Sequence, residues 1–190
     1  MIVGLLLAAG GARRFGSQKL VAPLRGLPLV RHAANVLIES TDAVVVVVGD
    51  RADDVRAALQ NAPIGFVKNP HWASGLSSSL QCGIAALPTL VDAIIVTLGD
   101  QPQLDPGVVR QVIARWRATG HPIVAARYLG VQGHPVLFDR SVFAELTALH
   151  GDGGAKAVIE RASERTTYVD VNAPAPRDID TPQDLTALSE

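Results

Sequence analysis

A glycine-rich segment with several cations lies near the start of the chain, where residues 7–19 read LAAGGARRFGSQK. Glycine lets a backbone turn sharply, which brings its N–H groups close to phosphate oxygens. The segment is not a P-loop, because two residues separate Gly16 from Lys19, and the GxGxxG pattern of dinucleotide-binding loops is absent. With Arg14 and Lys19 it predicts a loop that binds a triphosphate. The alternative is a solvated glycine-rich turn.

Two segments further along the chain contain acidic residues that could bind a metal ion. Asp100 follows an apolar run in the order Gly99-Asp100-Gln101-Pro102, and Asp178 and Asp180 alternate in the sequence RDIDTP of residues 177–182. Mg²⁺ in proteins takes one or two carboxylates, and phosphate oxygens and waters complete its shell. We therefore predict Asp100 and Asp180 as ligands of Mg²⁺. The alternatives are local roles, a turn residue at Asp100 and a helix cap at Asp180.

A cluster of hydroxyl groups occupies the predicted start of a helix, where residues 69–79 read NPHWASGLSSS. One capping side chain satisfies only one or two of the free N–H groups at a helix start, so three consecutive serines exceed what capping requires. Neutral hydroxyls beside a glycine suit the ribose or the base edge of a nucleotide. We therefore predict nucleotide binding by Gly75, Ser77, Ser78 and Ser79.

The composition excludes several other classes of protein. The formal net charge of −1 argues against nucleic acid or a membrane surface as the partner. No His, Cys and Asp cluster has zinc spacing, and the GxSxG elbow of serine hydrolases is absent. The single cysteine, Cys82, excludes an internal disulfide and is expected to be a buried, inert thiol. No basic region precedes the apolar start, so we expect no signal peptide and a cytoplasmic protein.

Apolar, β-branched runs alternate with amphipathic segments along most of the chain. The runs are continuously apolar, which is typical of strands covered on both faces, and they predict strands at residues 2–8, 43–48, 64–68, 93–98 and 123–126. Helical periodicity marks residues 29–37, 76–87 and 109–116. This alternation predicts an α/β protein with one doubly wound, mostly parallel sheet. Ligands bind such sheets beyond the carboxyl ends of the strands, where the polar segments described above are expected to meet.

The second half of the chain departs from this alternation. Its pattern predicts a strand opened by a turn at 133–138, helices at 142–149 and 155–162, a strand at 167–171 and a closing helix at 181–188. No linker, repeat or low-complexity segment interrupts the chain. We therefore expect residues 1–190 to form a single domain whose second half carries a small elaboration that faces the substrate.

Together these segments resemble the molybdopterin-dependent nucleotidyltransferase family, whose amino-terminal motif reads L-A-A-G-x-S/G-x-R-M/F-G-x-x-K. Here Arg14 matches the arginine of that motif and Lys19 matches its lysine. The resemblance continues in order through GLSSS at 75–79, GDQP at 99–102, GHP at 133–135, GDGGA at 151–155 and DTP at 180–182. It covers essentially the whole chain and is strongest to the cytidylyltransferases of this family, which join CMP to the phosphate of molybdopterin.

The resemblance implies a role for each matched segment. The nucleotide-binding residues would be Leu7, Ala8, Ala9, Gly10, Gly11 and Lys19, with the serine segment. The catalytic residues would be Lys19, Arg14 and Asp100, and Asp100 would bind Mg²⁺. The acceptor-binding residues would be Gly133, His134, Pro135 and Gly154. The guanylyl relatives usually read LAGG in the first motif, so Ala9 favours CTP over GTP.

The expected reaction is a single in-line displacement. A phosphate oxygen of the acceptor, molybdopterin by this resemblance, attacks the α-phosphorus of the nucleotide and pyrophosphate leaves. Mg²⁺ on Asp100 and Asp180, together with Lys19, Arg14 and the N–H groups of the loop, offsets the growing charge. A molybdoenzyme or a maturation protein is the expected protein partner. Two alternatives stay open: a cytidylyl- or guanylyltransferase for another phosphorylated acceptor, and a non-catalytic assembly protein that binds CTP and a pterin.

Overall fold

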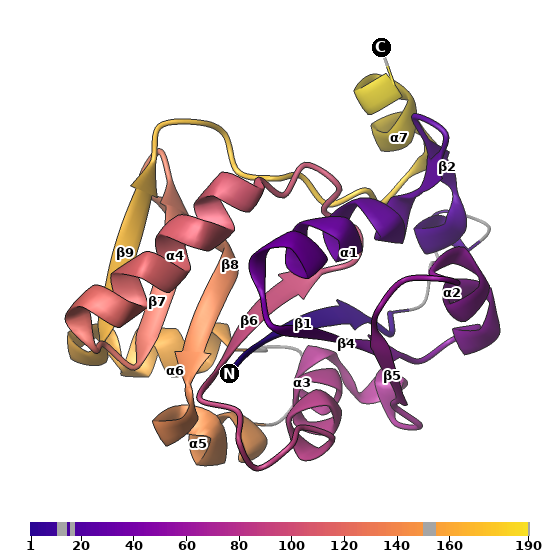
Figure 1. Cartoon of the computed structure of the whole chain (residues 1–190). Coiled ribbons are helices and arrows are strands. Elements are labelled where there is room, and N and C mark those ends of the chain that lie inside the picture. The colour runs from indigo at the N-terminus through magenta and orange to yellow at the C-terminus, as the bar shows by residue number, and fades with distance from the viewer. Residues whose placement is uncertain (11–14, 16–17, 150–154, 190) are drawn as a thin grey trace.

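The computed structural model describes residues 1–10, 15, 18–149 and 155–189, and Figure 1 shows how their elements are arranged. The main sheet contains β1 (Ile2–Ala8), β4 (Ala43–Val48), β5 (Gly65–Lys68), β6 (Ala93–Leu98), β7 (Ile123–Tyr128), β8 (Val131–Asp139) and β9 (Thr166–Val171). Their order across the sheet is β5-β4-β1-β6-β8-β7-β9. Strand β8 runs antiparallel to both of its neighbours, and the other described pairings in this sheet are parallel. The predicted α/β fold with a mostly parallel sheet is therefore confirmed.

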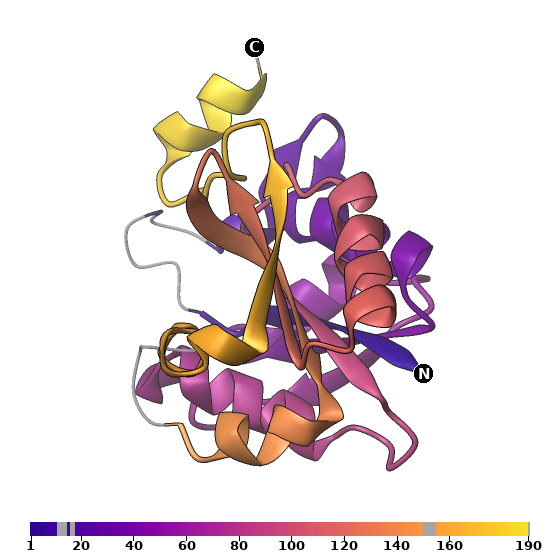
Figure 2. The ribbon, with the colours of Figure 1, turned by 90° about the vertical axis from the view of Figure 1, so that its left-hand side faces the viewer.

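Helices cover both faces of the sheet, which explains why its strands are continuously apolar. One face carries α1 (Leu29–Ser40), α2 (Ala52–Ala58) and α4 (Pro106–Thr119), and the other carries α3 (Leu76–Ala85), α5 (Phe143–Thr147) and α6 (Lys156–Arg161). Alternate residues of β1 pack into the two layers, Leu6 and Ala8 into the first and Leu5 and Leu7 into the second. Figure 2 shows α4 in salmon on one side of the strands and α5 and α6 in orange and gold on the other.

Several element boundaries differ from those predicted. Leu129 and Gly130 both have positive φ angles, of 47° and 88°, and close a two-residue hairpin that joins a longer β7 to an earlier start of β8. A second hairpin, β2 (Pro23–Leu24) with β3 (Leu27–Pro28), was not predicted, because its strands are too short to show alternation. The same applies to α2, which has only seven residues.

The environment of Cys82 also corrects an expectation. Its side chain is half-buried on α3 rather than fully buried, and its thiol lies 3.5 Å from the backbone oxygen of Lys68. Burial raises the pKa of this thiol above the usual range, so the expectation that it is unreactive at neutral pH is consistent with its surroundings.

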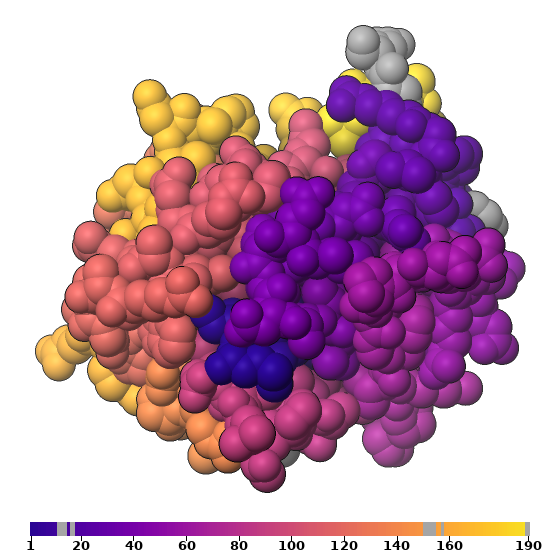
Figure 3. Space-filling view, in the orientation of Figure 1, coloured from indigo at the N-terminus to yellow at the C-terminus, as the bar shows by residue number. Residues whose placement is uncertain are grey.

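The segment that follows β9, residues 172–181, runs past the carboxyl end of β6, and we call it the C-terminal strap. It leads to α7 (Pro182–Ser189), whose Leu185 and Leu188 pack with Leu24 of the β2–β3 hairpin. Arg25 of that hairpin donates a hydrogen bond of 3.1 Å to the backbone oxygen of Leu188. Figure 3 shows yellow atoms of this end of the chain beside violet atoms of the N-terminal part. Among the described residues, no helix combines the length and the apolar character that crossing a bilayer requires.

Gly83 marks the closest approach of α3 to the sheet. A Cβ atom at this position would lie 2.6 Å from Cδ1 of Leu5 and 3.0 Å from Cγ2 of Val47, and both leucine and valine are fully buried. We predict that Gly83→Ala lowers the free energy of unfolding by about 1–2 kcal/mol, because overpacking outweighs the better helix propensity of alanine. Urea denaturation measures this change.

The matched control is Gly65→Ala in β5, where the nearest atom would be 3.8 Å away and the expected change is within about 0.5 kcal/mol. A Gly83→Ala variant as stable as its parent would show that α3 can move away from the sheet without cost.

Candidate functional site

Lys19 lies between two carboxylates that come from distant parts of the chain. Its Nζ is 2.7 Å from Oδ2 of Asp100 and 3.0 Å from Oδ1 of Asp180. Lys19 begins the short 3-10 helix Lys19–Val21, Asp100 follows β6, and Asp180 belongs to the C-terminal strap. The side chains of Lys19 and Asp100 are 11% and 21% exposed. The structure thus brings together three of the residues predicted for the site.

The charges of these residues depend on one another. Burial by itself lowers the pKa of Lys19, but the charge of Asp100 and the hydrogen bonds to both carboxylates outweigh it, so the pKa is raised above its ordinary value. Burial raises the pKa of Asp100, attraction to Lys19 opposes this rise, and repulsion by Asp178 adds to it. The cation beside Asp100 therefore favours the ionised form of this carboxyl.

The C-terminal strap is attached to the loop after β6 by two further hydrogen bonds. The backbone N–H of Ile179 donates to the backbone oxygen of Asp100 over 3.0 Å, and Nε2 of Gln101 donates to Oδ1 of Asp178 over 2.8 Å. Ile179 is 1% exposed, so its side chain anchors the strap as well. These contacts place Asp178 and Asp180 at the carboxyl end of β6.

The start of α7 is capped by Thr181 rather than by Asp180. The Thr181 N–H donates to Oδ2 of Asp184 over 2.7 Å, and the Asp184 N–H donates to Oγ1 of Thr181 over 3.2 Å, which is a reciprocal capping box. The role of helix cap, which was the alternative for Asp180, thus belongs to its neighbour Thr181. The carboxylate of Asp180 contacts Lys19 instead.

A cavity of about 350 Å³ opens beside Asp100. It is lined by Leu7, Ala9, Gly10, Trp72, Ala73, Gly75, Leu76, Ser79, Leu98 and Asp100. Gly49 allows Ala9 and Trp72, two residues of the cavity wall, to pack closely against the backbone. A Cβ atom at Gly49 would lie 2.5 Å from the backbone oxygen of Ala9 and 2.6 Å from Cβ of Trp72. The cavity collects most of the predicted nucleotide-binding residues that the structure describes.

The three serines of the segment 75–79 lie in different environments. Ser79 lines this cavity, whereas Ser77 is only 1% exposed. The Ser78 hydroxyl lies 2.8 Å from the backbone oxygen of Gly75 and accepts a hydrogen bond of 2.9 Å from Nδ2 of Asn69. Ser78 therefore stabilises the helix start. Nucleotide binding by the serines stays a prediction, and Ser79 is the serine that lines the cavity. Asn69, which also donates to Ser79, was missed, although its place directly after β5 could have indicated it.

Ala8 differs from its neighbours in the first motif. Its side chain is 2% exposed and packs into the layer that contains α1, on the face of the sheet opposite to Leu7 and Ala9. Any contact of Ala8 with a nucleotide would therefore involve its backbone.

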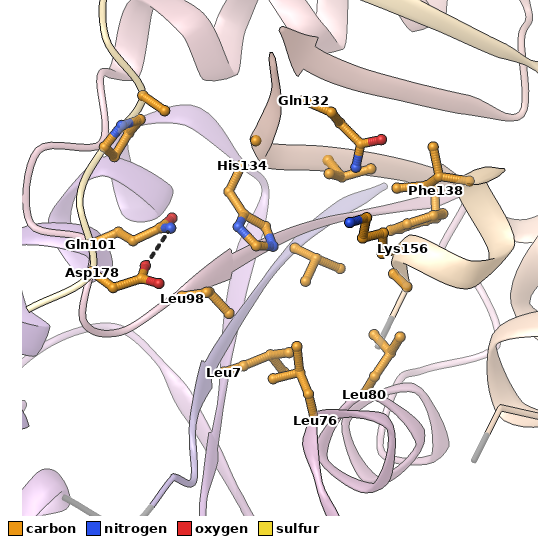
Figure 4. A pocket seen from close by; sticks show the side chains of 17 residues that line it. Leu7, Leu76, Leu80, Leu98, Gln101, Gln132, His134, Phe138, Lys156 and Asp178 are labelled. Atoms are coloured by element: carbon orange, nitrogen blue, oxygen red, sulfur yellow. Dashed lines mark hydrogen bonds between the residues drawn. The ribbon is translucent and has the colours of Figure 1, made fainter. Parts of the chain in front are cut away.

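A second cavity, of about 330 Å³, adjoins the first and shares Leu7, Leu76 and Leu98 with it. Figure 4 shows its apolar floor of leucines, with Gln101, Asp178 and His134 toward one side and Lys156 and Phe138 toward the other. The remaining residues of its lining are Leu80, Val96, Gln132, Gly133, Val136, Ala155, Ile159, Ala175 and Pro176.

Of the residues predicted to bind the acceptor, Gly133 and His134 line this second cavity. Pro135, joined to His134 by a cis peptide bond, is buried. The cavity is also lined by four residues that were not predicted to bind the acceptor: Gln101, Gln132, Lys156 and Asp178. Their common signal is closeness to the motifs: Gln101 lies within GDQP, Gln132 and Lys156 directly adjoin GHP and GDGGA, and Asp178 lies two residues before DTP.

Three predicted site residues, Gly11, Arg14 and Gly154, lie outside the described residues. Their roles stay predictions.

The carboxylates of Asp100 and Asp180 have the geometry to hold a divalent cation. One oxygen of each lies within 3.0 Å of a single point, the Nζ of Lys19. Within the described part of the chain, no group of three or more His, Cys, Asp or Glu side chains could hold a metal. Two carboxylates fit a cation such as Mg²⁺ whose shell is completed by phosphate oxygens and waters, because Mg²⁺ rarely uses an all-protein cage.

The contact with Lys19 leads to a prediction about metal affinity. A cation that binds both carboxylates must displace the ammonium group, so we predict that Lys19→Met binds Mn²⁺ in the absence of nucleotide about 10- to 100-fold more tightly than the parent. Titration of free Mn²⁺ by electron paramagnetic resonance measures this affinity.

Lys68→Met, which removes an exposed lysine, serves as the charge-matched control and should leave Mn²⁺ affinity unchanged. Equal or weaker Mn²⁺ binding by Lys19→Met would mean that the two carboxylates are not the metal ligands.

Comparisons with known proteins show the family of this chain. Residues 4–166 match the MobA-like NTP transferase domain family. Nicotine blue oxidoreductase of Paenarthrobacter nicotinovorans is 31% identical over 98% of this chain and 96% of its own length. Molybdenum cofactor cytidylyltransferase of Escherichia coli (strain K12) is 22% identical over 98% of this chain and 94% of its own length.

A similar solved structure is the crystal structure of Rv0371c from Mycobacterium tuberculosis. It superimposes with a TM-score of 0.89 at 31% identity, covering 99% of this chain and 97% of that one. Rv0371c has also been crystallised in a complex with manganese, which superimposes with a TM-score of 0.83. The chain belongs to the MobA-like NTP transferase domain family and is a nucleotidyltransferase.

Proposed function

We propose that this nucleotidyltransferase moves CMP from CTP onto the phosphate of molybdopterin and releases pyrophosphate. The observation that carries the proposal is the pair of adjoining cavities, which share Leu7, Leu76 and Leu98. Asp100 lines the first cavity and Gln101, the next residue, lines the second. Two substrates bound in these cavities would meet beside Lys19 and Asp100, as transfer between them requires.

The residues of the chain act mainly by positioning and by charge. In this proposal the first cavity holds CTP with its phosphates toward Lys19. The second cavity holds the acceptor with its phosphate toward the boundary between the two cavities. An oxygen of the acceptor phosphate forms a bond to the α-phosphorus, the bond from that phosphorus to the β-phosphate oxygen breaks, and its electron pair leaves with pyrophosphate. The attacking phosphate is already ionised, so the chain need not supply a strong base.

Lys19 and the cation site stabilise charge during this transfer. The ammonium of Lys19 donates to phosphate oxygens once it leaves the carboxylates. A divalent cation on Asp100 and Asp180, Mg²⁺ in this proposal, offsets negative charge on the phosphates when bound. The manganese complex of Rv0371c supports a divalent cation in this fold. Preorganised charges of this kind commonly make the largest contribution to catalysis of phosphoryl and nucleotidyl transfer.

The assignment of molybdopterin draws on the full-length similarity to the E. coli cytidylyltransferase. In this proposal the protein acts in the cytoplasm. Its product passes to a molybdoenzyme or to a maturation protein. Pyrophosphate release separates the proposal from a non-catalytic assembly protein, since only a transferase releases pyrophosphate when acceptor is added. A panel of phosphorylated acceptors separates molybdopterin from the alternative acceptors.

We predict that Asp100→Asn retains the fold and lowers kcat by about 10²–10³, because removing one preorganised charge-stabilising group commonly has this effect. Pyrophosphate release from CTP and molybdopterin measures kcat, and thermal unfolding checks the fold. Asp53→Asn, an exposed change of the same kind on α2, is the control and should match the parent. Turnover near the parental value for Asp100→Asn at saturating Mg²⁺ would remove Asp100 from the site.

We also predict that CTP is preferred over GTP by about 30- to 150-fold in kcat/KM. Ala9 and Trp72 both line the first cavity, and in this proposal the Ala9 methyl group leaves less room for a two-ring base than for a one-ring base. Competition between CTP and GTP in one reaction measures the ratio directly. Ala9→Gly should lower it, since the methyl group is removed.

A ratio at or below one for the parent would refute the cytidylyl assignment and leave the nucleotidyltransferase assignment unchanged.

A further inference from the structure

One end of the second cavity presents mainly hydrogen-bond acceptors. Nε2 of Gln101 donates to Oδ1 of Asp178, which fixes the orientation of the amide. The other amide atom, Oε1 of Gln101, is buried without a hydrogen-bond partner among the described residues, and the whole residue is only 7% exposed. Figure 4 shows this amide and the Asp178 carboxylate on the same side of the cavity, with His134 next to them.

His134 adds a neutral ring to this end of the cavity. Burial lowers the pKa of His134 to about 4, and the charge of Asp178 opposes this shift only in part. At neutral pH the imidazole is therefore uncharged, and one of its nitrogens can accept a hydrogen bond. The position of His134 is held by Tyr128, whose hydroxyl donates to the backbone oxygen of His134 over 2.8 Å.

The rest of the lining is mostly apolar, with Leu7, Leu80, Leu98, Val136 and Phe138 among its residues. A buried acceptor without a donor is unfavourable, and the exposed carboxylate of Asp178, which takes the Gln101 hydrogen bond on Oδ1, has further acceptor capacity beside it. A flat ring that carries adjacent N–H groups along one edge would satisfy these acceptors and also contact the apolar walls. A ring with a carbonyl at the same place would face the carboxylate with like partial charge.

We propose that Asp178, Gln101 and His134 are specificity-determining residues, which recognise the acceptor through adjacent N–H donors on the edge of a flat heteroaromatic ring. The inference rests on the proposed function only in taking the second cavity as the acceptor site. Gln101 directly follows Asp100, and Asp178 lies two residues before Asp180. Recognition of the ring edge therefore fixes the acceptor relative to the carboxylates that contact Lys19.

The test compares two rings that differ at C2 of this edge, where an amino group beside an unprotonated N1 is replaced by a carbonyl beside an N1–H. The ring 2-amino-4-oxopteridine presents an amino group beside a ring N–H, and 2,4-dioxopteridine presents a carbonyl in place of that amino group. Their binding is measured by quenching of ring fluorescence, without nucleotide or metal. We expect the parent to bind the amino ring about 10- to 100-fold more tightly. Equal binding, or no binding of either ring, would overturn the inference.

Asp178→Asn tests the residue itself, since it keeps the shape of the side chain and replaces one acceptor with a donor. We expect the preference for the amino ring over the dioxo ring to fall to about onefold. If Asp178 had only a structural role, the substitution would weaken the binding of both rings equally and leave the ratio of their affinities unchanged. Asp53→Asn is again the control. An Asp178→Asn variant that keeps the parental preference would remove Asp178 from the recognition of the ring.

A third ligand keeps the inference testable should Asp178→Asn fail to fold. The 3-methyl derivative of the amino ring lacks the ring N–H and should bind the parent at least about tenfold more weakly. Undiminished binding of this derivative would contradict the inference. These experiments need no transfer reaction, so the ring preference can hold while pyrophosphate release fails, or the reverse. The inference and the proposed function are thus tested separately.

Discussion

The contact of Lys19 with Asp100 and Asp180 is the constraint on which the site depends. It joins residues that are 81 and 161 positions apart in the chain, so it forms only when the first loop, the end of β6 and the C-terminal strap are all in place. Partly buried carboxylates are unfavourable without a cation, and loss of one partner leaves the other charge uncompensated. This arrangement makes the positions of three separate segments depend on one another.

The strap is held by contacts that do not use the side chain of Asp180. Thr181 and Asp184 cap α7, that helix packs against the β2–β3 hairpin, and Ile179 bonds to the backbone of Asp100. The carboxylate of Asp180 is therefore positioned by its neighbours and contacts Lys19. A group supported in this way keeps its place when the cation beside it changes, which suits a site where an ammonium group gives way to a metal ion.

Two adjoining cavities lie at this end of the sheet. Leu7, Leu76 and Leu98 separate a cavity lined by the first motif from a cavity lined by β8, α6 and the strap. The antiparallel strand β8 matters here, because it brings Gly133 and His134 to the edge of the sheet where the parallel strands end. The elaboration of the second half of the chain thus forms the wall of the second cavity.

The sequence by itself determined the sheet and the family. Continuous apolar runs identified the central strands because strands covered on both faces exclude polar residues, and motifs in a fixed order were specific enough to identify the nucleotidyltransferase family. Lysine and aspartate after strand ends also predicted which side chains would meet, since parallel strands place their carboxyl ends together, and Lys19 does contact Asp100.

Only the tertiary structure decided which side chains share a cavity. The sequence did not distinguish Ser79, which lines a cavity, from Ser78, which stabilises a helix start, because the difference lies in the hydrogen bonds of the Ser78 hydroxyl to the backbone oxygens of His71 and Gly75. Nor did it show that Gln101 orients Asp178, because 77 residues separate them. Local patterns reflect periodicity and turn chemistry, whereas the direction and the partner of a polar side chain depend on segments that only folding brings together.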